Sequence, residues 1–332
     1  MDILKKIHQR AKEKKRKIVL PETDDARVLE ATKVVVEEGL ADVILLSSDS
    51  ALKSKADSIG LNLSSVKIVN PKTDQQLLKK FVTEFYELRK HKGITMEAAQ
   101  QQIGHFVYFA AMMVRNGLAD GFVAGAGHTT PDVAKAAIYC IGFTEKLKTI
   151  SSSFLVIVPD CEYGHHGIFI FSDCGIVPDP SAAQLANIAE SAAELFGLLV
   201  EEKPRVALLS FSSKGSANHP LVEKVVKAKQ IINEKYPDLI VDGELQLDAA
   251  IVPQVAKIKA PQSDVAGSAN VLIFPGLESG NIGYKLVQRL AKAQVIGPMM
   301  TGLKKPCSDL SRGCTIDEIV NAVCTTAIRV AD

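Results

Sequence analysis

The feature that most constrains the fold is a repeated alternation of short β-branched runs with longer stretches of helical periodicity. Near the N-terminus, "KIVLP" (17–21) and "DVILLSS" (42–48) flank the helical pattern "DARVLEATKVVVEEGLA" (25–41), and "VKIVN" (66–70) precedes another helical pattern at 73–93. Continuous apolar runs of this length are typical of strands buried on both faces. The alternation therefore predicts an α/β fold in which helices cover both sides of a mainly parallel sheet.

The next segment predicts one long helix followed by a buried strand. The helix is expected over "TMEAAQQQIGHFVYFAAMMVRNGLA" (95–119), with Met112 and Met113 in the core, and it leads into the strand "DGFVAGAG" (120–127). A further helix is expected to begin near Pro131, because proline is favoured at the first helical position.

The pattern changes after about residue 147, which indicates a second domain. Here "SSSFLVIVP" (151–159) and "GIFIFSD" (167–173) lie close together, as expected of an antiparallel hairpin, and strand–helix alternation then resumes. The last helix, from Thr315 to about Arg329, is expected to return to the first domain. We therefore predict a discontinuous first domain (1–147 plus 306–332) and a second domain (148–305).

Composition narrows the class of protein. The formal net charge of +1 gives no general attraction to nucleic acid or membranes, and no apolar run approaches the roughly 20 residues of a membrane span. We therefore expect a cytoplasmic protein with small-molecule partners. The cysteines form no CxxC pair, and "CEYGHHGIFIFSDC" (161–174) matches two strands joined by a turn better than a zinc site.

The stretch "CSDLSRGCTIDEIVN" (307–321) is the strongest candidate for a ligand site. Thr315 and Glu318 fit the S/T-x-x-E capping box, so a helix begins here with its positive end toward the preceding loop. Ser311 and Arg312 stand in that loop, where an anion such as phosphate would be stabilised. The alternative is that Arg312 caps a neighbouring element and Glu318 serves only the box.

Three other stretches carry cations near helix ends. In "PGLESGNIGYKLVQRL" (275–290), Lys285 and Arg289 lie four residues apart and thus on one face, which suits a polyphosphate or a solvated basic surface. Arg89 ends the helical pattern in "ELRKHKG" (87–93). The stretch "SFSSKGSANHP" (210–220) only loosely resembles a phosphate loop, and the G-x-x-x-x-G-K-[ST] and G-x-G-x-x-G signatures of nucleotide sites are absent.

Several of these motifs together resemble the phosphate acetyltransferases. They are "SFSSKGSANHP", "DGELQLDAAIVPQVA", "ANVLIFPGLESGNIGYKLVQRL" and "GPMMTGLKKPCSDLSRGCTIDEIVNAV", and the resemblance begins at "VLPETDDARVLEA". It implies reversible acetyl transfer between coenzyme A and phosphate (acetyl-CoA + phosphate = acetyl phosphate + CoA), with no other cofactor and no metal. It also implies a homodimer of two-domain α/β chains, similar in fold to isocitrate and isopropylmalate dehydrogenases, with the active site in an interdomain cleft.

By matching motif, the resemblance implies that Ser311 hydrogen-bonds the acetyl carbonyl oxygen and that Arg312 binds the phosphoryl group. The family's base for the CoA thiol is an aspartate in the first turn of the last helix. Glu318 occupies the matching position here, and Asp317 lies next to it. We favour Glu318, although the capping box competes for the same carboxylate, and either residue remains a candidate.

The resemblance also implies contacts for the substrates. Arg89 keeps a family arginine, whereas Lys135 stands where relatives commonly carry arginine, so bidentate recognition of an anion is lost there. Tyr284, Lys285 and Arg289 match positions expected to contact CoA.

We favour direct attack of the CoA thiolate on acetyl phosphate in a ternary complex. The competing mechanism is an acyl-enzyme on Cys307, Cys314 or Ser311, but no histidine lies within this stretch to activate one. The rival functions are a phosphate butyryltransferase, a non-catalytic acetyl-CoA-sensing module, and a metal-dependent hydroxy-acid dehydrogenase of the same fold.

Overall fold

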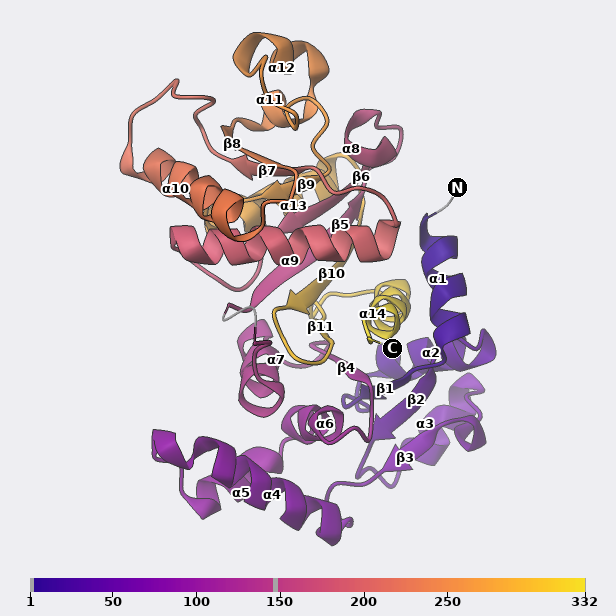
Figure 1. Ribbon diagram of the computed structural model, residues 1–332. Coiled ribbons are helices and arrows are strands. Elements are labelled where there is room, and N and C mark those ends of the chain that lie inside the picture. Colours follow the sequence, from indigo (N-terminus) through magenta and orange to yellow (C-terminus); the bar gives the residue numbers. More distant parts are fainter. Residues whose placement is uncertain (1–2, 146–148, 332) are drawn as a thin grey trace. The chain divides into compact units, whose positions relative to one another are not determined.

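The computed structural model describes residues 3–145 and 149–331, and its fold is mixed α/β. The chain divides into two compact units, residues 1–144 with 303–332 (unit 1) and residues 145–302 (unit 2). The domain boundary expected at 147/148 lies outside the described residues. Each unit is considered by itself below (Figure 1).

Unit 1 is built around five short parallel strands with the order β3-β2-β1-β4-β11. Its strands are β1 (Lys17–Leu20), β2 (Asp42–Leu46), β3 (Lys67–Val69), β4 (Gly121–Ala124) and β11 (Cys307–Asp309). Its helices are α1 (Ile3–Lys14), α2 (Ala26–Glu37), α3 (Leu52–Ile59), α4 (Gln75–Arg89), α5 (Met96–Ile103), α6 (Phe106–Arg115), α7 (Thr130–Ala136) and α14 (Ile316–Ile328), with the short turns η1 (Leu63–Ser65), η2 (Lys90–Lys92) and η3 (Ala137–Ile141).

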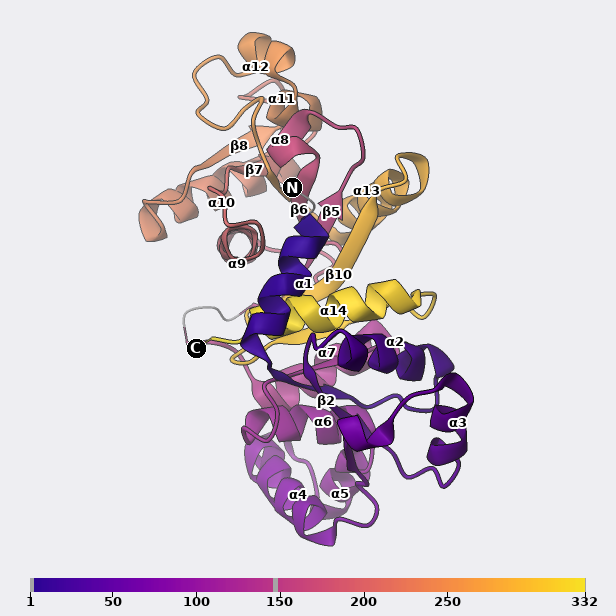
Figure 2. The same ribbon diagram turned by 90° about the vertical axis from the view of Figure 1, so that its right-hand side faces the viewer.

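Helices cover both faces of this sheet. The last helix, α14, packs against α1, α2 and the strands β1 and β4, whereas α6 contacts β4 and lies on the opposite face from α14 (Figures 1 and 2). The N-termini of α2 and α4 are capped by the side chains of Asp25 and Asp74, which accept backbone N–H groups of the first turn.

The single helix expected over 95–119 is wrong, because two helices occupy that stretch. Gly104 ends α5, and His105 has an extended backbone (φ −78°, ψ 127°) before α6 begins at Phe106. Gly104 itself keeps helical dihedrals (φ −62°, ψ −21°), so the break lies at His105. Met112 and Met113 are fully buried in α6, as expected from their apolar surroundings.

Unit 2 contains a mixed sheet with the order β10-β5-β6-β9-β7-β8. Its strands are β5 (Ser151–Ile157), β6 (Ile168–Ser172), β7 (Val206–Leu209), β8 (Val241–Leu245), β9 (Val271–Ile273) and β10 (Gln294–Thr301). Its helices are α8 (Tyr163–His166), α9 (Ala182–Val200), α10 (Pro220–Lys235), α11 (Leu247–Ile251), α12 (Pro253–Lys259) and α13 (Leu277–Leu290).

The predicted hairpin is confirmed, since β5 and β6 pair antiparallel with Ser153 opposite Ser172. Strands β6, β9, β7 and β8 then pair in parallel. Helices α9 and α13 both contact β6 and lie on opposite faces of the sheet (Figure 2). Helix α9 is buried along most of its length and packs against α10 and the strands β6 and β9.

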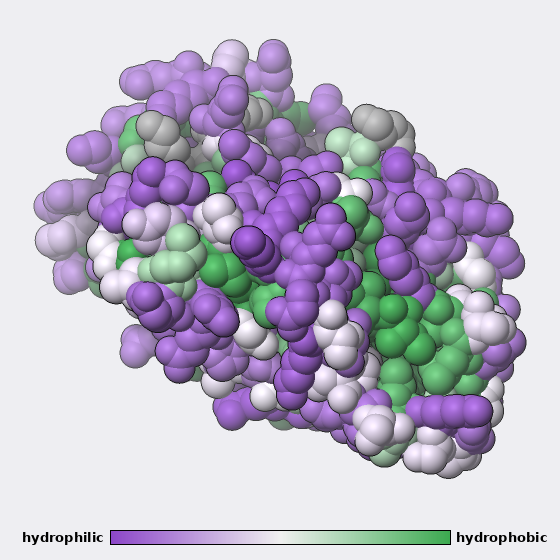
Figure 3. Space-filling model, turned by 90° about the horizontal axis from the view of Figure 1, so that it is seen from below, coloured by the Kyte–Doolittle hydropathy of each residue, from purple (hydrophilic) through white to green (hydrophobic). Residues whose placement is uncertain are grey.

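Charged and polar residues cover most of the face seen in Figure 3, with groups of apolar residues among them. Within 3–145 and 149–331, none of the helices has the length and apolar character that crossing a membrane requires.

Candidate active site

The order of strands in unit 1 defines where a ligand site is expected. The chain runs outward from β1 to β2 and β3 and then returns to β4 on the other side of β1. In parallel α/β sheets, ligands bind beyond the carboxyl ends of the strands at such a reversal. The segments that leave β1, β4 and β11 at this edge contain Glu22, residues 125–128 and the predicted loop at 310–314.

Ser311 and Arg312 are both exposed in the loop between β11 and α14. Ser311 Oγ accepts a hydrogen bond from the Gly313 N–H (3.3 Å), so its own proton stays available for an external acceptor. Among the described residues we find no hydrogen-bond or ion-pair partner for the Arg312 guanidinium. An exposed guanidinium next to a hydroxyl donor is suited to bind an anionic, oxygen-rich ligand.

Arg27, in the first turn of α2, holds this loop in place. Its Nη1 donates to the carbonyl oxygens of Arg312 (2.9 Å) and Cys314 (2.8 Å), and its Nη2 donates to the carbonyl oxygen of Ala126 (3.2 Å). Nε and Nη2 form a bidentate pair with Asp25, which raises the pKa of Arg27. The side chain thereby joins the segments that follow β1, β4 and β11.

Glu22 forms a second connection between these segments, and its side chain is buried. Its carboxylate accepts hydrogen bonds from the backbone N–H groups of Gly125 (2.8 Å), Ala126 (2.9 Å) and Gly127 (2.9 Å), and it contacts Nδ1 of His128 at 2.6 Å. Burial opposes ionisation, but these donors outweigh it and lower the pKa of Glu22. The loop after β4 is thus folded around a carboxylate supplied by β1's neighbouring segment.

Asp309, the last residue of β11, is a buried carboxyl group beside this loop. Its Oδ2 accepts a hydrogen bond from Thr130 Oγ1 (2.5 Å), and its Oδ1 is buried without a partner in the described part of the chain. Burial raises the pKa of Asp309 to about 7, and the charge of Glu22 acts in the same direction. Gly125, at φ +120°, has to be glycine because a Cβ there would overlap Asp309 Oδ1 and the backbone of Leu310.

The first turn of α14 carries both candidate bases. The predicted capping box is confirmed: Thr315 Oγ1 accepts from the Glu318 N–H (3.2 Å), and Glu318 Oε2 accepts from the Thr315 N–H (3.0 Å). Asp317 is exposed one residue earlier. Glu318 is therefore already engaged with the backbone, as the sequence suggested, while the Asp317 carboxylate faces solvent.

The two cysteines that flank the loop are poor nucleophiles. Burial raises the pKa of Cys314 to about 11, although the charge of Arg27 opposes this, and burial holds the pKa of Cys307 well above its usual range. Since the thiolate is the reactive form, neither side chain is activated for acyl transfer.

Arg89 and Lys135 belong to neighbouring helices of unit 1. The Arg89 guanidinium carbon lies 3.8 Å from the centroid of the Tyr139 ring, and Tyr139 is in the π-helical turn η3 that extends α7. Lys135 is exposed one turn before Tyr139 on the same helix. Cation–π stacking holds Arg89 against this helix, so the structure brings these two predicted substrate contacts to a common region.

Tyr284, Lys285 and Arg289 all lie on α13 of unit 2. The ring of Tyr284 stacks on Phe154, with centroids 4.4 Å apart, and packs against the core of unit 2. Lys285 and Arg289 are exposed. The two cations are thus available on the surface of α13, whereas the tyrosine is held partly inside.

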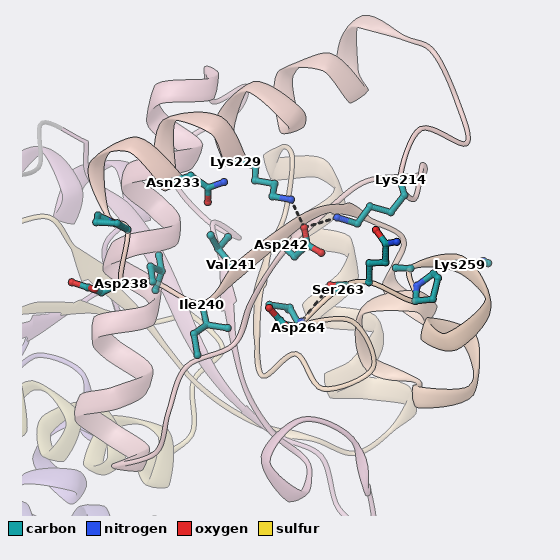
Figure 4. A pocket seen from close by; sticks show the side chains of 16 residues that line it. Lys214, Lys229, Asn233, Asp238, Ile240, Val241, Asp242, Lys259, Ser263 and Asp264 are labelled. Carbon is teal, nitrogen blue, oxygen red and sulfur yellow. Dashed lines mark hydrogen bonds and ion pairs between the residues drawn. The ribbon is translucent and has the colours of Figure 1, made fainter.

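The loosely phosphate-like stretch at 210–220 binds carboxylates of its own unit. The Gly215 N–H and the Ser212 hydroxyl donate to Glu244 Oε1 at 2.7 and 3.0 Å, and Lys214 pairs with Asp242 at 2.5 Å. Lys229 points to the same carboxylate from α10, at the wall of a pocket of about 730 Å³ (Figure 4).

Within the described ranges, no cluster of three or more His, Cys, Asp or Glu side chains could hold a metal ion. Sequence reasoning missed Glu22, Arg27, His128 and Tyr139 as parts of the site. The only signal for the first three was their position just after predicted strands, in "PETDDAR" and "GAGHTTPD".

The fold and this site define an α/β protein with an exposed serine–arginine loop beyond the carboxyl ends of parallel strands, and comparison with known proteins gives the family. The family model described as "Phosphate acetyl/butaryl transferase" matches residues 2–327. The phosphate acetyltransferase of Thermoanaerobacterium thermosaccharolyticum is 49% identical over 99% of both chains, and that of Acetivibrio thermocellus is 48% identical over 99% of this chain and 98% of its own. This chain belongs to the phosphate acetyl/butyryl transferase family.

Solved structures agree with that assignment. A phosphotransacetylase from Streptococcus pyogenes is 39% identical, with a TM-score of 0.92, and the match covers 99% of this chain and 98% of that one. A 4-hydroxythreonine-4-phosphate dehydrogenase from Klebsiella pneumoniae shares only the fold, at 11% identity and a TM-score of 0.52 over 96% of this chain and all of that one. This match confirms a dehydrogenase-like fold, and the expected likeness to isocitrate and isopropylmalate dehydrogenases in particular stays a prediction.

Proposed function

We propose that this protein is a phosphate acetyltransferase, which transfers an acetyl group reversibly between coenzyme A and inorganic phosphate. The proposal rests above all on relatives named for this activity that match over the full length of the chain. It is supported by the exposed Ser311 and Arg312 on a loop held by Arg27. No cofactor besides the substrate CoA and no metal is part of the proposal.

In the direction of acetyl-CoA synthesis, the thiolate of CoA attacks the carbonyl carbon of acetyl phosphate. A carbon–sulfur bond forms, the carbon–oxygen bond to the phosphoryl group breaks, and phosphate leaves with the bonding electrons. Ser311 donates a hydrogen bond to the carbonyl oxygen, on which negative charge develops. Arg312 binds the phosphoryl oxygens and stabilises the leaving phosphate.

The thiol proton goes to a carboxylate in the first turn of α14. Glu318 remains our preferred base, and to act as one it must break the hydrogen bond that its Oε2 accepts from the Thr315 N–H. Asp317 is exposed and needs no such rearrangement. The two assignments therefore differ in whether the capping box opens during turnover.

We infer that transfer is direct, in a ternary complex. The raised pKa values of Cys307 and Cys314 speak against either as a nucleophile. If acetyl-CoA alone labelled the protein covalently, and double-reciprocal plots ran parallel, transfer through an acyl-enzyme would replace this mechanism.

The contacts with CoA are a further part of the proposal. Arg89 and Lys135 of unit 1 are assigned to substrate binding, and Tyr284, Lys285 and Arg289 of unit 2 to CoA. For both sets to act on substrates bound together, the two units, taken as the two domains, must form a cleft around them. A crystal structure with CoA and phosphate that left either set without contact would refute that assignment.

A homodimer is proposed from the exposed face of α13. Ile282, Leu286 and Leu290 recur every four residues, and their exposures are 59%, 52% and 79%. Contiguous large apolar side chains on one helical face suit a second copy of the chain. Light scattering should give twice the chain mass of 35.8 kDa, and a monomer would refute the proposal.

We place the protein in the cytoplasm, which fractionation of the source cells would test.

The decisive experiment measures phosphate-dependent release of the CoA thiol from acetyl-CoA. Wild type should require phosphate, and Ser311→Ala and Arg312→Gln should each lower kcat about 100-fold or more, because each removes a donor to a charge that develops in the transition state. Comparison of Asp317→Asn with Glu318→Gln identifies the base. Absence of thiol release in wild type would refute the function, and faster turnover of butyryl-CoA would make the protein a butyryltransferase.

A further inference from the structure

His128 lies at the reversal point of the unit 1 sheet, and the mechanism above does not use it. Its Nδ1 is 2.6 Å from Oε1 of Glu22, whose side chain is only 5% exposed, whereas 41% of the His128 side chain is exposed. The two ring nitrogens point in nearly opposite directions. With Nδ1 directed at a buried carboxylate, Nε2 is directed away from Glu22 and toward the exposed side of the ring.

The exposed side of His128 belongs to the same edge of the sheet as Ser311 and Arg312. Two residues after His128, Thr130 donates to Asp309, which stands two residues before Ser311. Arg27 ties the carbonyl oxygen of residue 126 to that of residue 312. The loop of His128 and the loop of Arg312 are therefore fixed to each other at both ends.

Several charged groups act on His128. The hydrogen bond to Glu22 is the main influence and raises the pKa of His128, while partial burial opposes it. Asp132, in the first turn of α7, adds a smaller effect in the same direction. Glu22 is itself kept ionised by backbone donors. The surroundings thus favour an imidazolium whose second N–H is presented outward.

We propose that His128 is a second phosphate-binding residue, whose Nε2–H donates a hydrogen bond to an oxygen of inorganic phosphate or of the phosphoryl group of acetyl phosphate. This inference rests on the proposed function, because it assigns His128 to the anion that Arg312 binds. Glu22 is a positioning residue in this arrangement. It orients the ring and stabilises its charge without contact to the substrate.

The test compares two isosteric replacements. His128→Asn keeps a donor near the Nδ1 position for Glu22 but removes Nε2 and the charge, whereas His128→Gln reaches the Nε2 position and loses the donor to Glu22. His166→Asn in α8 is the matched control, because its φ of 52° is one that asparagine tolerates. Kinetics are measured with phosphate varied at saturating acetyl-CoA, and binding is measured as the thermal shift produced by inorganic phosphate.

His128→Asn should raise the KM for phosphate about 10-fold or more, the effect of losing one charge-assisted hydrogen bond, with the KM for acetyl-CoA within about twofold of wild type. The thermal shift produced by phosphate should fall in parallel. His128→Gln should show a smaller increase in the KM for phosphate and a smaller loss of the thermal shift than His128→Asn. Inhibition of wild type by sulfate, whose charge is constant between about pH 6 and 9, should weaken as His128 loses its proton, and this loss should be absent in His128→Asn.

If His128→Asn left the KM for phosphate and the thermal shift by phosphate unchanged, the inference would be wrong. The proposed function would still stand in that case, provided that wild type is active. A lower melting temperature with unchanged phosphate KM would show a purely structural histidine and also overturn it. If wild type released no thiol, yet phosphate stabilised wild type and not His128→Asn, the proposed function would fail and the anion site would stand. Should the variants not fold, sulfate inhibition of wild type that does not vary with pH would refute the inference.

Discussion

The buried carboxyl group of Asp309 should make the stability of this protein fall as the pH rises toward neutrality. Burial raises its pKa from 3.8 to about 7 in the folded chain, while the unfolded chain exposes the side chain to water. Between these values the folded state holds one proton more than the unfolded state, so raising the pH favours unfolding. Above pH 7 both states are ionised and the loss is complete.

The magnitude follows from the same two values. Each pKa unit corresponds to about 1.4 kcal/mol, so the two units between pH 5 and the folded pKa of about 7 correspond to about 3 kcal/mol. Asp309→Asn has no proton to lose and can still accept from Thr130 Oγ1. When the pH is raised from 5 to 8, the free energy of unfolding of the variant should therefore rise by about 3 kcal/mol relative to that of wild type, whatever the stability of the variant at pH 5.

Urea unfolding followed by circular dichroism at both pH values measures this difference, since the chain has no tryptophan to report by fluorescence. Asp24→Asn is the control, because that side chain is 91% exposed and should show no such gain. A difference between Asp309→Asn and wild type that is the same at pH 5 and pH 8 would show that Asp309 does not hold a proton in the folded state, and the account of this site would be wrong.

Two further outcomes follow from the loop at 311–314. Arg27→Lys should lower kcat about tenfold, because lysine cannot donate to the carbonyl oxygens of Arg312 and Cys314 and to Asp25 at the same time. Measurement of kcat at saturating substrate concentrations tests this. Added guanidinium should partly restore the activity of Arg27→Ala. Cys314→Ser should keep kcat within about tenfold of wild type, since a thiol with a pKa of about 11 is almost wholly protonated near neutrality. A loss of all turnover in Cys314→Ser, with intact folding, would restore the acyl-enzyme mechanism.

The sequence alone determined the elements and their class, because hydrophobic periodicity and capping are local properties. The capping box of Thr315 and Glu318 and the hairpin of β5 and β6 were readable from adjacent residues. The long helix at 95–119 failed for the same reason: Gly104 is tolerated within helices, and only the packing of α5 and α6 decides that the chain breaks there. The long motifs identified the family by their resemblance to known members, and the comparisons confirmed that family.

Tertiary structure decided which distant residues act together. Nothing in the sequence pairs Glu22 with His128, Arg27 with the backbone at 312–314, or Arg89 with the ring of Tyr139. The first two contacts arise because parallel strands bring their carboxyl ends to one edge, so residues more than one hundred positions apart become neighbours. The third arises because α4 packs against η3. Burial in the folded chain also determines the charge state of Asp309, because exclusion of water is the largest influence on its pKa.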